Sequence, residues 1–302
     1  MYLSQFSKIF NLTCRNDVAE LKVRCGEWDT QTTSEPYPHQ DRAVKALRIH
    51  PEYEGRALFN DFAVLFLESN FDLDVHLDSV CLPQPDETFD GSTCFATGWG
   101  KDKFGSAGEY QVVLKEIDLP IVSNDICQDS LRTTRLGKRF KLHPSFICAG
   151  GIPGKDTCKG DGGSPLVCPS KYSPNTYVQA GIVAWGIGCG ETGTPGVYAG
   201  VSKAVCWIDQ AMTCYYGGQT GDYNSFWGYS DAVCGAATRG AIQRVEDSRR
   251  PQALKSILVK QYQECTVNYK VEGGNSNGGY VDGEEDDFSA FERVGTPPSA
   301  DK

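Results

Sequence analysis

The sequence predicts an all-β fold whose short antiparallel strands close into barrels. Residues 15–82 alternate short apolar stretches with turns, and residues 92–202 repeat this pattern. Short apolar runs between turn residues are typical of antiparallel strands. Strands are expected at residues 21–24, 62–67, 111–115, 165–168 and 177–184. Two such sets, one after the other in the chain, predict two barrels.

Two helices and one crossing interrupt this pattern. Ser123 or Asn124 could cap the first helix, because both side chains accept hydrogen bonds from the first turn of a helix. The second helix is expected over residues 202–212, where it closes the second barrel. The Leu-Pro-Gln-Pro segment at residues 82–85 is expected to cross from one barrel to the other.

The chain is expected to divide into four parts. Residues 1–91 are assigned to the first barrel and residues 92–212 to the second. Residues 213–272 are an extension of unknown structure, with a modest helical pattern at 240–264. In residues 273–302, Gly, Asn, Ser and acidic residues dominate, which predicts a disordered acidic tail.

The cysteine content indicates the compartment. Thirteen cysteines in 302 residues indicate an oxidising environment, and therefore a secreted protein. No Cys-x-x-Cys pair or His/Cys cluster suggests zinc, so no metal or other cofactor is expected. No apolar run approaches ~18 residues, so no membrane span is expected. Residues 1–10 make a poor signal-peptide core, and the leader is expected upstream of this chain.

The charge is unevenly distributed. The formal net charge is −10, and residues 272–302, with eight acidic and two basic residues, supply −6 of it. The rest of the chain is mildly acidic, which argues against a nucleic-acid partner. One loop is an exception to this mildly acidic character, because it is basic. It is either simply solvated or a docking patch for an acidic partner. It consists of Arg132, Arg135, Lys138, Arg139 and Lys141.

The most informative segment is residues 158–165, Cys-Lys-Gly-Asp-Gly-Gly-Ser-Pro. It resembles Gly-Asp-Ser-Gly-Gly-Pro, the nucleophile loop of chymotrypsin-like serine proteases. Gly162 occupies the position of the serine, and a glycine offers no nucleophile. The resemblance therefore implies a protease scaffold from which the reaction has been removed.

Other landmarks of that family follow in its own order over residues 15–212. Residues 60–65 resemble the segment of the triad aspartate. The second barrel has counterparts of family segments at residues 94–100, 146–150, 182–186 and 195–198. Some segments of the sequence resemble even more closely those of the arthropod clip-domain serine protease homologues of the phenoloxidase-activating type. That likeness is carried by residues 24–30, 49–53 and 98–102.

The resemblance also predicts the architecture and one departure from it. The family fold consists of two six-stranded antiparallel β-barrels and a C-terminal helix. The family's cleaved Ile-Val-Gly-Gly-type start and its Thr-Ala-Ala-His-Cys segment are missing from this sequence. The first barrel is therefore expected to be incomplete, with unpaired strand edges, and the chain to be N-terminally truncated.

A catalytic triad needs a hydroxyl, an imidazole and a carboxylate. The resemblance assigns the carboxylate to Asp61, here retained only for local hydrogen bonding. The imidazole should lie near residue 16, where there is no histidine. Ser164 falls past the position of the nucleophile, too far to replace it. Ala184 stands where the family usually has a serine that supports the carboxylate. The four histidines are expected to be ordinary surface residues: His39, His50, His76 and His143.

The resemblance places an oxyanion hole and a specificity pocket nearby. Backbone N–H groups of Gly160 and Gly162 are expected to form the oxyanion hole, since backbone donors do not depend on side chains. Asp161, which pairs with the cleaved N-terminus in active members, is expected to be unpaired. The pocket is assigned to Asp156 at its base and to Gly186 and Gly196 on its walls. It either accepts Arg or Lys through a carboxylate pair or is an inherited shape that nothing enters.

The resemblance also pairs six cysteines, Cys94 with Cys168, Cys127 with Cys148, and Cys158 with Cys189. Each bond should stabilise the fold by ~3–4 kcal/mol. An odd number remains, which implies a free thiol or an intermolecular bond. Cys81 resembles the family cysteine that tethers an upstream segment, and it is a candidate for the free thiol. The remaining cysteines are Cys14, Cys25, Cys81, Cys206, Cys214, Cys234 and Cys265.

Three functions fit these observations. The first, implied by the resemblance, is a secreted, non-catalytic protein of the haemolymph. It would bind prophenoloxidase or its activating protease and assist the melanization cascade of innate immunity. The second is an active trypsin-like endopeptidase cleaving after Arg or Lys, which only Asp61 and Asp156 support. The third is a truncated, non-functional product, which the short first barrel and the odd cysteine count favour.

Overall fold

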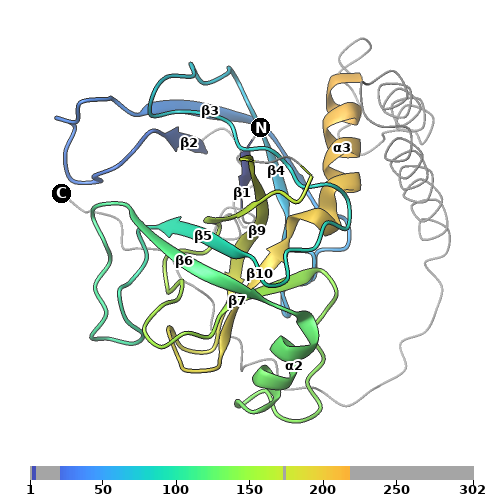
Figure 1. Ribbon diagram of the computed structural model, residues 1–302. Coiled ribbons are helices and arrows are strands. Elements are labelled where there is room, and N and C mark those ends of the chain that lie inside the picture. The colour runs from blue at the N-terminus through green and yellow to red at the C-terminus, as the bar shows by residue number, and fades with distance from the viewer. Residues whose placement is uncertain (1, 5–20, 173–174, 218–302) are drawn as a thin grey trace. The chain divides into compact units, whose positions relative to one another are not determined.

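A computed structural model describes residues 2–4, 21–172 and 175–217 (Figure 1). Its N-terminal part forms a four-stranded antiparallel sheet with the order β1-β4-β3-β2. The strands are β1 (Tyr2–Ser4), β2 (Lys22–Cys25), β3 (Gln40–Ile49) and β4 (Ala63–Leu67). Four strands in the described part agree with the prediction of an incomplete first barrel.

The second part is a closed six-stranded antiparallel barrel, as the sequence predicts. Around the ring the order is β10-β7-β6-β5-β8-β9, and β5, β6 and β7 lie side by side in Figure 1. The strands are β5 (Thr93–Gly98), β6 (Lys115–Val122), β7 (Phe146–Gly150), β8 (Pro165–Pro169), β9 (Tyr177–Trp185) and β10 (Pro195–Gly200).

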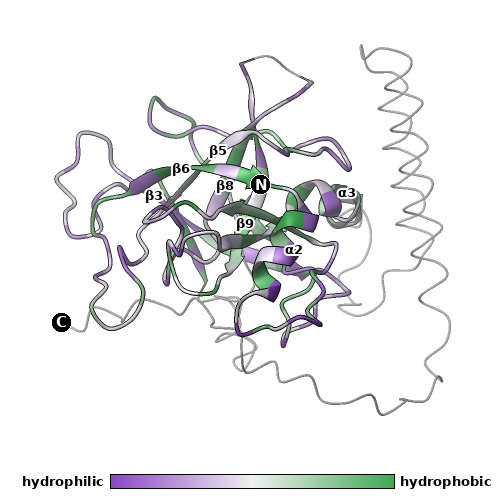
Figure 2. Cartoon of the chain, turned by 60° about the horizontal axis from the view of Figure 1, so that its bottom comes forward, coloured by the Kyte–Doolittle hydropathy of each residue, from purple (hydrophilic) through white to green (hydrophobic). Residues whose placement is uncertain are grey.

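Side-chain patterning explains why these segments form a barrel. In β5, the buried positions alternate along the strand at Cys94, Ala96 and Gly98, the period expected of a strand with one face in the core. In β9, every residue after the first is buried, and Figure 2 shows this strand among the hydrophobic ones. The core between them includes Leu119, Leu166 and Tyr198, which have no exposed surface.

Helix α2 (Asn124–Arg132) begins where the sequence predicts. Ser123 is its N-cap, but the Ser123 side chain makes no capping bond. The Asn124 side chain instead donates to the carbonyl of Phe146 at 2.9 Å and ties the helix to β7. Cys127 and Leu131 form its buried face, and Figure 2 shows hydrophobic and hydrophilic residues on the same helix.

Helix α3 (Val201–Gly217) is longer than the predicted 202–212. Within the described parts of the chain, neither helix is both long and apolar enough to cross a membrane. The predicted helical pattern at 240–264 and the predicted tail at 273–302 lie outside the described residues. The four-part division of the chain stays a prediction.

One strand prediction is wrong. The segment 111–115 was expected to be a strand, but β6 begins only at Lys115. The residues before it pair instead with the segment after β2: Leu114 N–H donates to the carbonyl of Trp28 at 2.8 Å, and Thr30 N–H donates to that of Val112 at 3.1 Å. An extended segment with apolar residues can make such isolated bridges without joining a sheet, and its sequence does not distinguish the two cases.

Candidate functional site

The loop that carries Gly162 keeps a defined shape. Asp161 is buried, and its carboxylate accepts hydrogen bonds from the backbone N–H groups of Gly100, at 2.7 Å, and Cys158, at 2.8 Å. The expectation that Asp161 is unpaired is therefore wrong, because backbone donors stabilise the buried charge. A Cβ atom at Gly100 would overlap this carboxylate, so the position has room for glycine alone.

Backbone hydrogen bonds fix the same loop to β9. Gly163 N–H donates to the carbonyl of Val183 at 3.0 Å, and Val183 N–H donates to that of Ser164 at 2.9 Å. Gly162 directly precedes Gly163 and Ser164 and is buried. These hydrogen bonds hold the loop in place, and the assignment of Gly162 to the position of the nucleophile stays a prediction. Gly160 has a φ of +108° and lies close to the ring of Tyr110. The use of Gly160 and Gly162 as an oxyanion hole stays a prediction.

The Ser164 side chain lies close to strand β5. A Cβ atom built at Gly98 would lie 3.1 Å from the Ser164 hydroxyl oxygen, so the hydroxyl is directed at the backbone of β5. This position supports the prediction that Ser164 does not act as a substitute nucleophile.

Asp61 is separated from β4 by Phe62 alone and has no exposed surface. The turn before it has two residues with positive φ, Leu58 at 60° and Asn60 at 50°. Asn60 N–H donates to the Ser145 hydroxyl at 3.1 Å, which links this turn to the segment before β7. Ala184, next to the last residue of β9, is also buried. The role of Asp61 as a former triad carboxylate stays a prediction.

The four histidines are partly buried rather than ordinary surface residues, so that prediction is wrong. Burial lowers the pKa of His50 to about 4, which keeps its ring neutral. His76 stacks on Tyr37, with ring centroids 5.1 Å apart. His143 stacks on Phe59 and makes a 2.9 Å hydrogen bond with the Ser145 hydroxyl. Packing against aromatic rings explains the burial of His76 and His143, and sequence spacing does not show it.

A cavity of about 410 Å³ has two of the predicted pocket residues in its lining, and its use as a specificity pocket stays a prediction. Gly186 and Gly196 both line it, as does the Cys158–Cys189 disulfide. Asp156 lies beneath Gly196: a Cβ atom there would be 2.9 Å from the Asp156 Oδ1 atom. Asp156 itself is not among the residues that line the cavity.

The Asp156 carboxyl group has one satisfied oxygen. Oδ2 accepts a hydrogen bond from Gly190 N–H at 3.0 Å, whereas Oδ1 is buried and has no hydrogen-bond partner among the described residues. Burial raises the pKa of Asp156 to about 7, although the Gly190 hydrogen bond opposes the rise. An unsatisfied buried carboxylate oxygen is suited to a cationic ligand that enters the cavity.

The pocket has a wall that sequence reasoning missed. Lys101, Phe104, Gly105 and Ser106, all from one loop, also line it. The Lys101 ammonium donates to the carbonyl of Gly105 at 3.0 Å and lies over the ring of Tyr110. These contacts fold the loop back on itself. No local sequence signal predicts how far a glycine-containing loop reaches.

The structure contains the three disulfides that the sequence analysis pairs, Cys94–Cys168, Cys127–Cys148 and Cys158–Cys189. Cys206 is also disulfide-bonded. Cys25 is a buried free thiol and Cys81 an exposed one.

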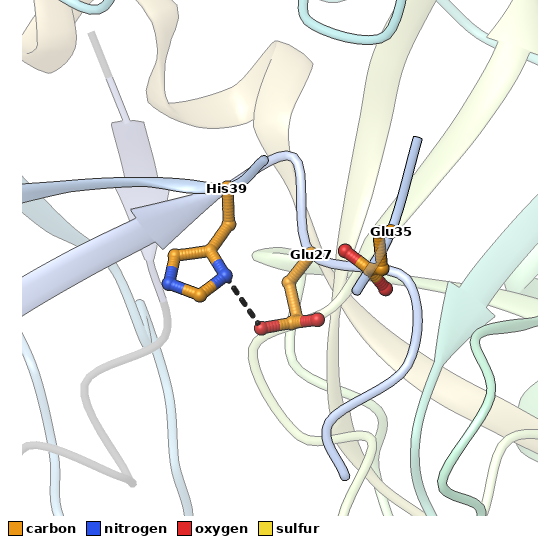
Figure 3. Close-up of side chains that lie close together, drawn as sticks. All are labelled: Glu27, Glu35 and His39. Atoms are coloured by element: carbon orange, nitrogen blue, oxygen red, sulfur yellow. Dashed lines mark ion pairs between the residues drawn. The ribbon is translucent and has the colours of Figure 1, made fainter. Parts of the chain in front are cut away.

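A second group of titratable side chains lies in the loop between β2 and β3. Ligand atoms of Glu27, Glu35 and His39 lie within 4.8 Å of one another, close enough to hold one cation (Figure 3). Glu27 already pairs with two cationic or potentially cationic groups, His39 at 3.1 Å and Arg24 at 3.2 Å. Glu35 accepts a hydrogen bond from Asp29 N–H. Contacts within the protein therefore already satisfy these carboxylates.

Comparison with known proteins agrees with this geometry. The family model described as Trypsin matches residues 11–208. The chain is 57% identical over 193 residues to phenoloxidase-activating factor 2 of Galleria mellonella, covering 64% of each chain. It is 44% identical over 191 residues to inactive CLIP domain-containing serine protease A28 of Anopheles gambiae, covering 63% of this chain and 49% of that one.

A more distant relative is serine proteinase stubble of Drosophila melanogaster, 35% identical over 192 residues, which cover 63% of this chain and 24% of that one. The chain thus spans less than two thirds of the length of these relatives. The family match covers β2, β3 and β4 of the four-stranded sheet, the barrel and the loop of Gly162. The chain belongs to the trypsin family, on the branch of the clip-domain serine protease homologues.

Proposed function

We propose that this protein is a secreted, non-catalytic serine protease homologue that binds and regulates proteins of an extracellular protease cascade. The observation that carries the proposal is Gly162, because the loop around it is well formed and lacks the hydroxyl that attacks a peptide bond. Loss of the nucleophile costs about a millionfold in turnover in a well-studied serine protease. A protease scaffold that keeps its shape but lacks its nucleophile is suited to binding other proteins.

The names of the relatives support a specific cascade. One of them is a phenoloxidase-activating factor and another is an inactive protease. We infer that this protein assists activation of prophenoloxidase in haemolymph, by binding prophenoloxidase or the protease that cleaves it. Disulfides within the barrel support a secreted location.

The first test asks whether the chain is an enzyme. The intact secreted protein is incubated with a fluorophosphonate probe, with bovine trypsin as the positive control. We expect no labelling, because the probe needs an activated hydroxyl. The Gly162→Ser variant should also stay unlabelled, since the sequence has no histidine near the position that the family geometry requires. Labelling of the wild-type protein at any side chain would overturn the proposal and favour the active protease.

The second test asks what the protein assists. Purified prophenoloxidase and its activating protease are mixed with and without the protein, and phenoloxidase activity is followed. We expect the activity to rise in proportion to the molar amount of protein added. Equal activity with and without the protein, at amounts up to a molar excess, would contradict a role in this cascade.

A further inference from the structure

A dense group of cations follows helix α2. We call it the basic loop: Arg132, Arg135, Lys138, Arg139 and Lys141. Arg132 is half-buried and pairs with Asp129 at 3.0 Å. The other four side chains are exposed and form no ion pair with any residue that the structure describes. Four uncompensated cations within seven residues create a positive field on a protein whose net charge is −10.

The backbone of the basic loop is already shaped. The Arg132 guanidinium donates through Nε to the carbonyl of Phe140 at 2.8 Å and so closes the loop. Leu142 N–H donates to the Gln128 side chain at 3.0 Å. The ring of Phe140 packs edge-on against Trp185, with centroids 6.2 Å apart. A ligand would have to order only the exposed side chains, which lowers the entropic cost of binding.

The composition of the basic loop is better suited to binding a polyanion than to binding the surface of another protein. Centres of protein interfaces are rich in aromatic side chains and poor in Lys. The two apolar residues of the loop, Leu136 and Phe140, are partly buried and pack in the cluster around Trp185. Short Lys/Arg-rich segments, here Lys138-Arg139-Phe140-Lys141, are typical of heparin and nucleic-acid patches.

Two observations favour a polysaccharide over a nucleic acid. The barrel beside the loop is disulfide-bonded, and Cys127–Cys148 joins α2 to β7 directly. Such bonds persist in oxidising, extracellular surroundings. Single-stranded nucleic acid is also usually held by aromatic side chains that stack on its bases, and none of the exposed side chains at residues 132–141 is aromatic.

We propose that the basic loop binds a linear sulfated polysaccharide. Arg135, Lys138, Arg139 and Lys141 contact its sulfate groups. The planar guanidinium groups can bind two oxygens of one sulfate, as they do with phosphate, and the ammonium groups act as point charges. Binding releases the counterions of the polyanion, so the affinity should fall steeply with salt. This inference does not depend on the proposed role in phenoloxidase activation.

The test measures binding of the full-length protein to heparin at about 50 and 200 mM salt. The Lys138→Ala/Arg139→Ala variant should bind at least about tenfold more weakly at the lower salt, with a salt slope smaller by about two. The matched control is Lys45→Ala/Arg56→Ala, which removes one exposed Lys and one exposed Arg elsewhere and should change the affinity less than about twofold. Equal losses in the two variants would overturn the proposal, because net charge alone would then explain binding.

A second variant and a set of competitors complete the test. Arg135→Ala/Lys141→Ala should weaken binding like the first variant, and both should melt at the wild-type temperature because the side chains are exposed. Desulfated heparin should fail to compete. If desulfated heparin, polyglutamate or duplex DNA competes as well as heparin at equal charge concentration, sulfate recognition is wrong.

Discussion

The Asp156 carboxyl group has a pKa of about 7, because burial disfavours its charged form. A cation in the pocket would need this group ionised. About a tenth of it is ionised at pH 6 and about nine tenths at pH 8. We therefore expect benzamidine, whose amidinium mimics an arginine side chain, to bind about tenfold more tightly at pH 8 than at pH 6, as measured by calorimetry.

The control for this prediction is Asp156→Asn. The amide cannot ionise, so this variant should bind benzamidine weakly and with the same affinity at both pH values. Wild-type binding that does not change with pH, or that matches the binding of Asp156→Asn, would mean that the carboxylate is not used and that the pocket is an inherited shape.

The two free thiols among the residues that the structure describes should react very differently. Cys81 is exposed, whereas burial of Cys25 raises its thiol pKa to about 11. With iodoacetamide at pH 8, we expect native protein to be alkylated at Cys81 and not at Cys25. In urea, both should be alkylated, and peptide mass spectrometry reads out each site. Alkylation of Cys25 in the native protein at the rate of Cys81 would show that the core around β2 opens readily.

Among the structural elements, β5 and the Gly162 loop are in close contact. Gly100, just after β5, donates to the Asp161 carboxylate and leaves no space for a Cβ atom. Gly100→Ala should therefore lower the free energy of unfolding by about 3 kcal/mol, through overpacking and a weakened charge-assisted hydrogen bond. Urea denaturation with the disulfides intact measures the change.

A second glycine provides the control. At Gly186, the nearest atom to an added Cβ is the carbonyl oxygen of Gly188, at an ordinary 3.6 Å. Gly186→Ala should change the stability by less than about 1 kcal/mol. If the two variants are equally stable, the Asp161 contact does not hold the loop.

For the molecule as a whole, the sequence predicts the features that depend on short, continuous stretches of residues. Strands such as β4 and β9 follow from apolar runs, and the motif of residues 158–165 locates the pocket and its disulfide. The features that the sequence could not predict depend on contacts between residues that lie far apart in the chain. The Asp161 bond to Gly100 spans 61 residues, and the pairing of Trp28 with Leu114 replaces an expected strand. Neither contact leaves a periodic pattern in the sequence.

The glycine at position 162 also changes how much of this protein would be required. A protease is needed only in traces, because each copy destroys many target molecules in turn. Under the proposed non-catalytic function, a polypeptide that binds here would be released uncleaved, so its occupancy would depend on concentration and affinity and not on elapsed time. The protein should therefore act mole for mole with its target.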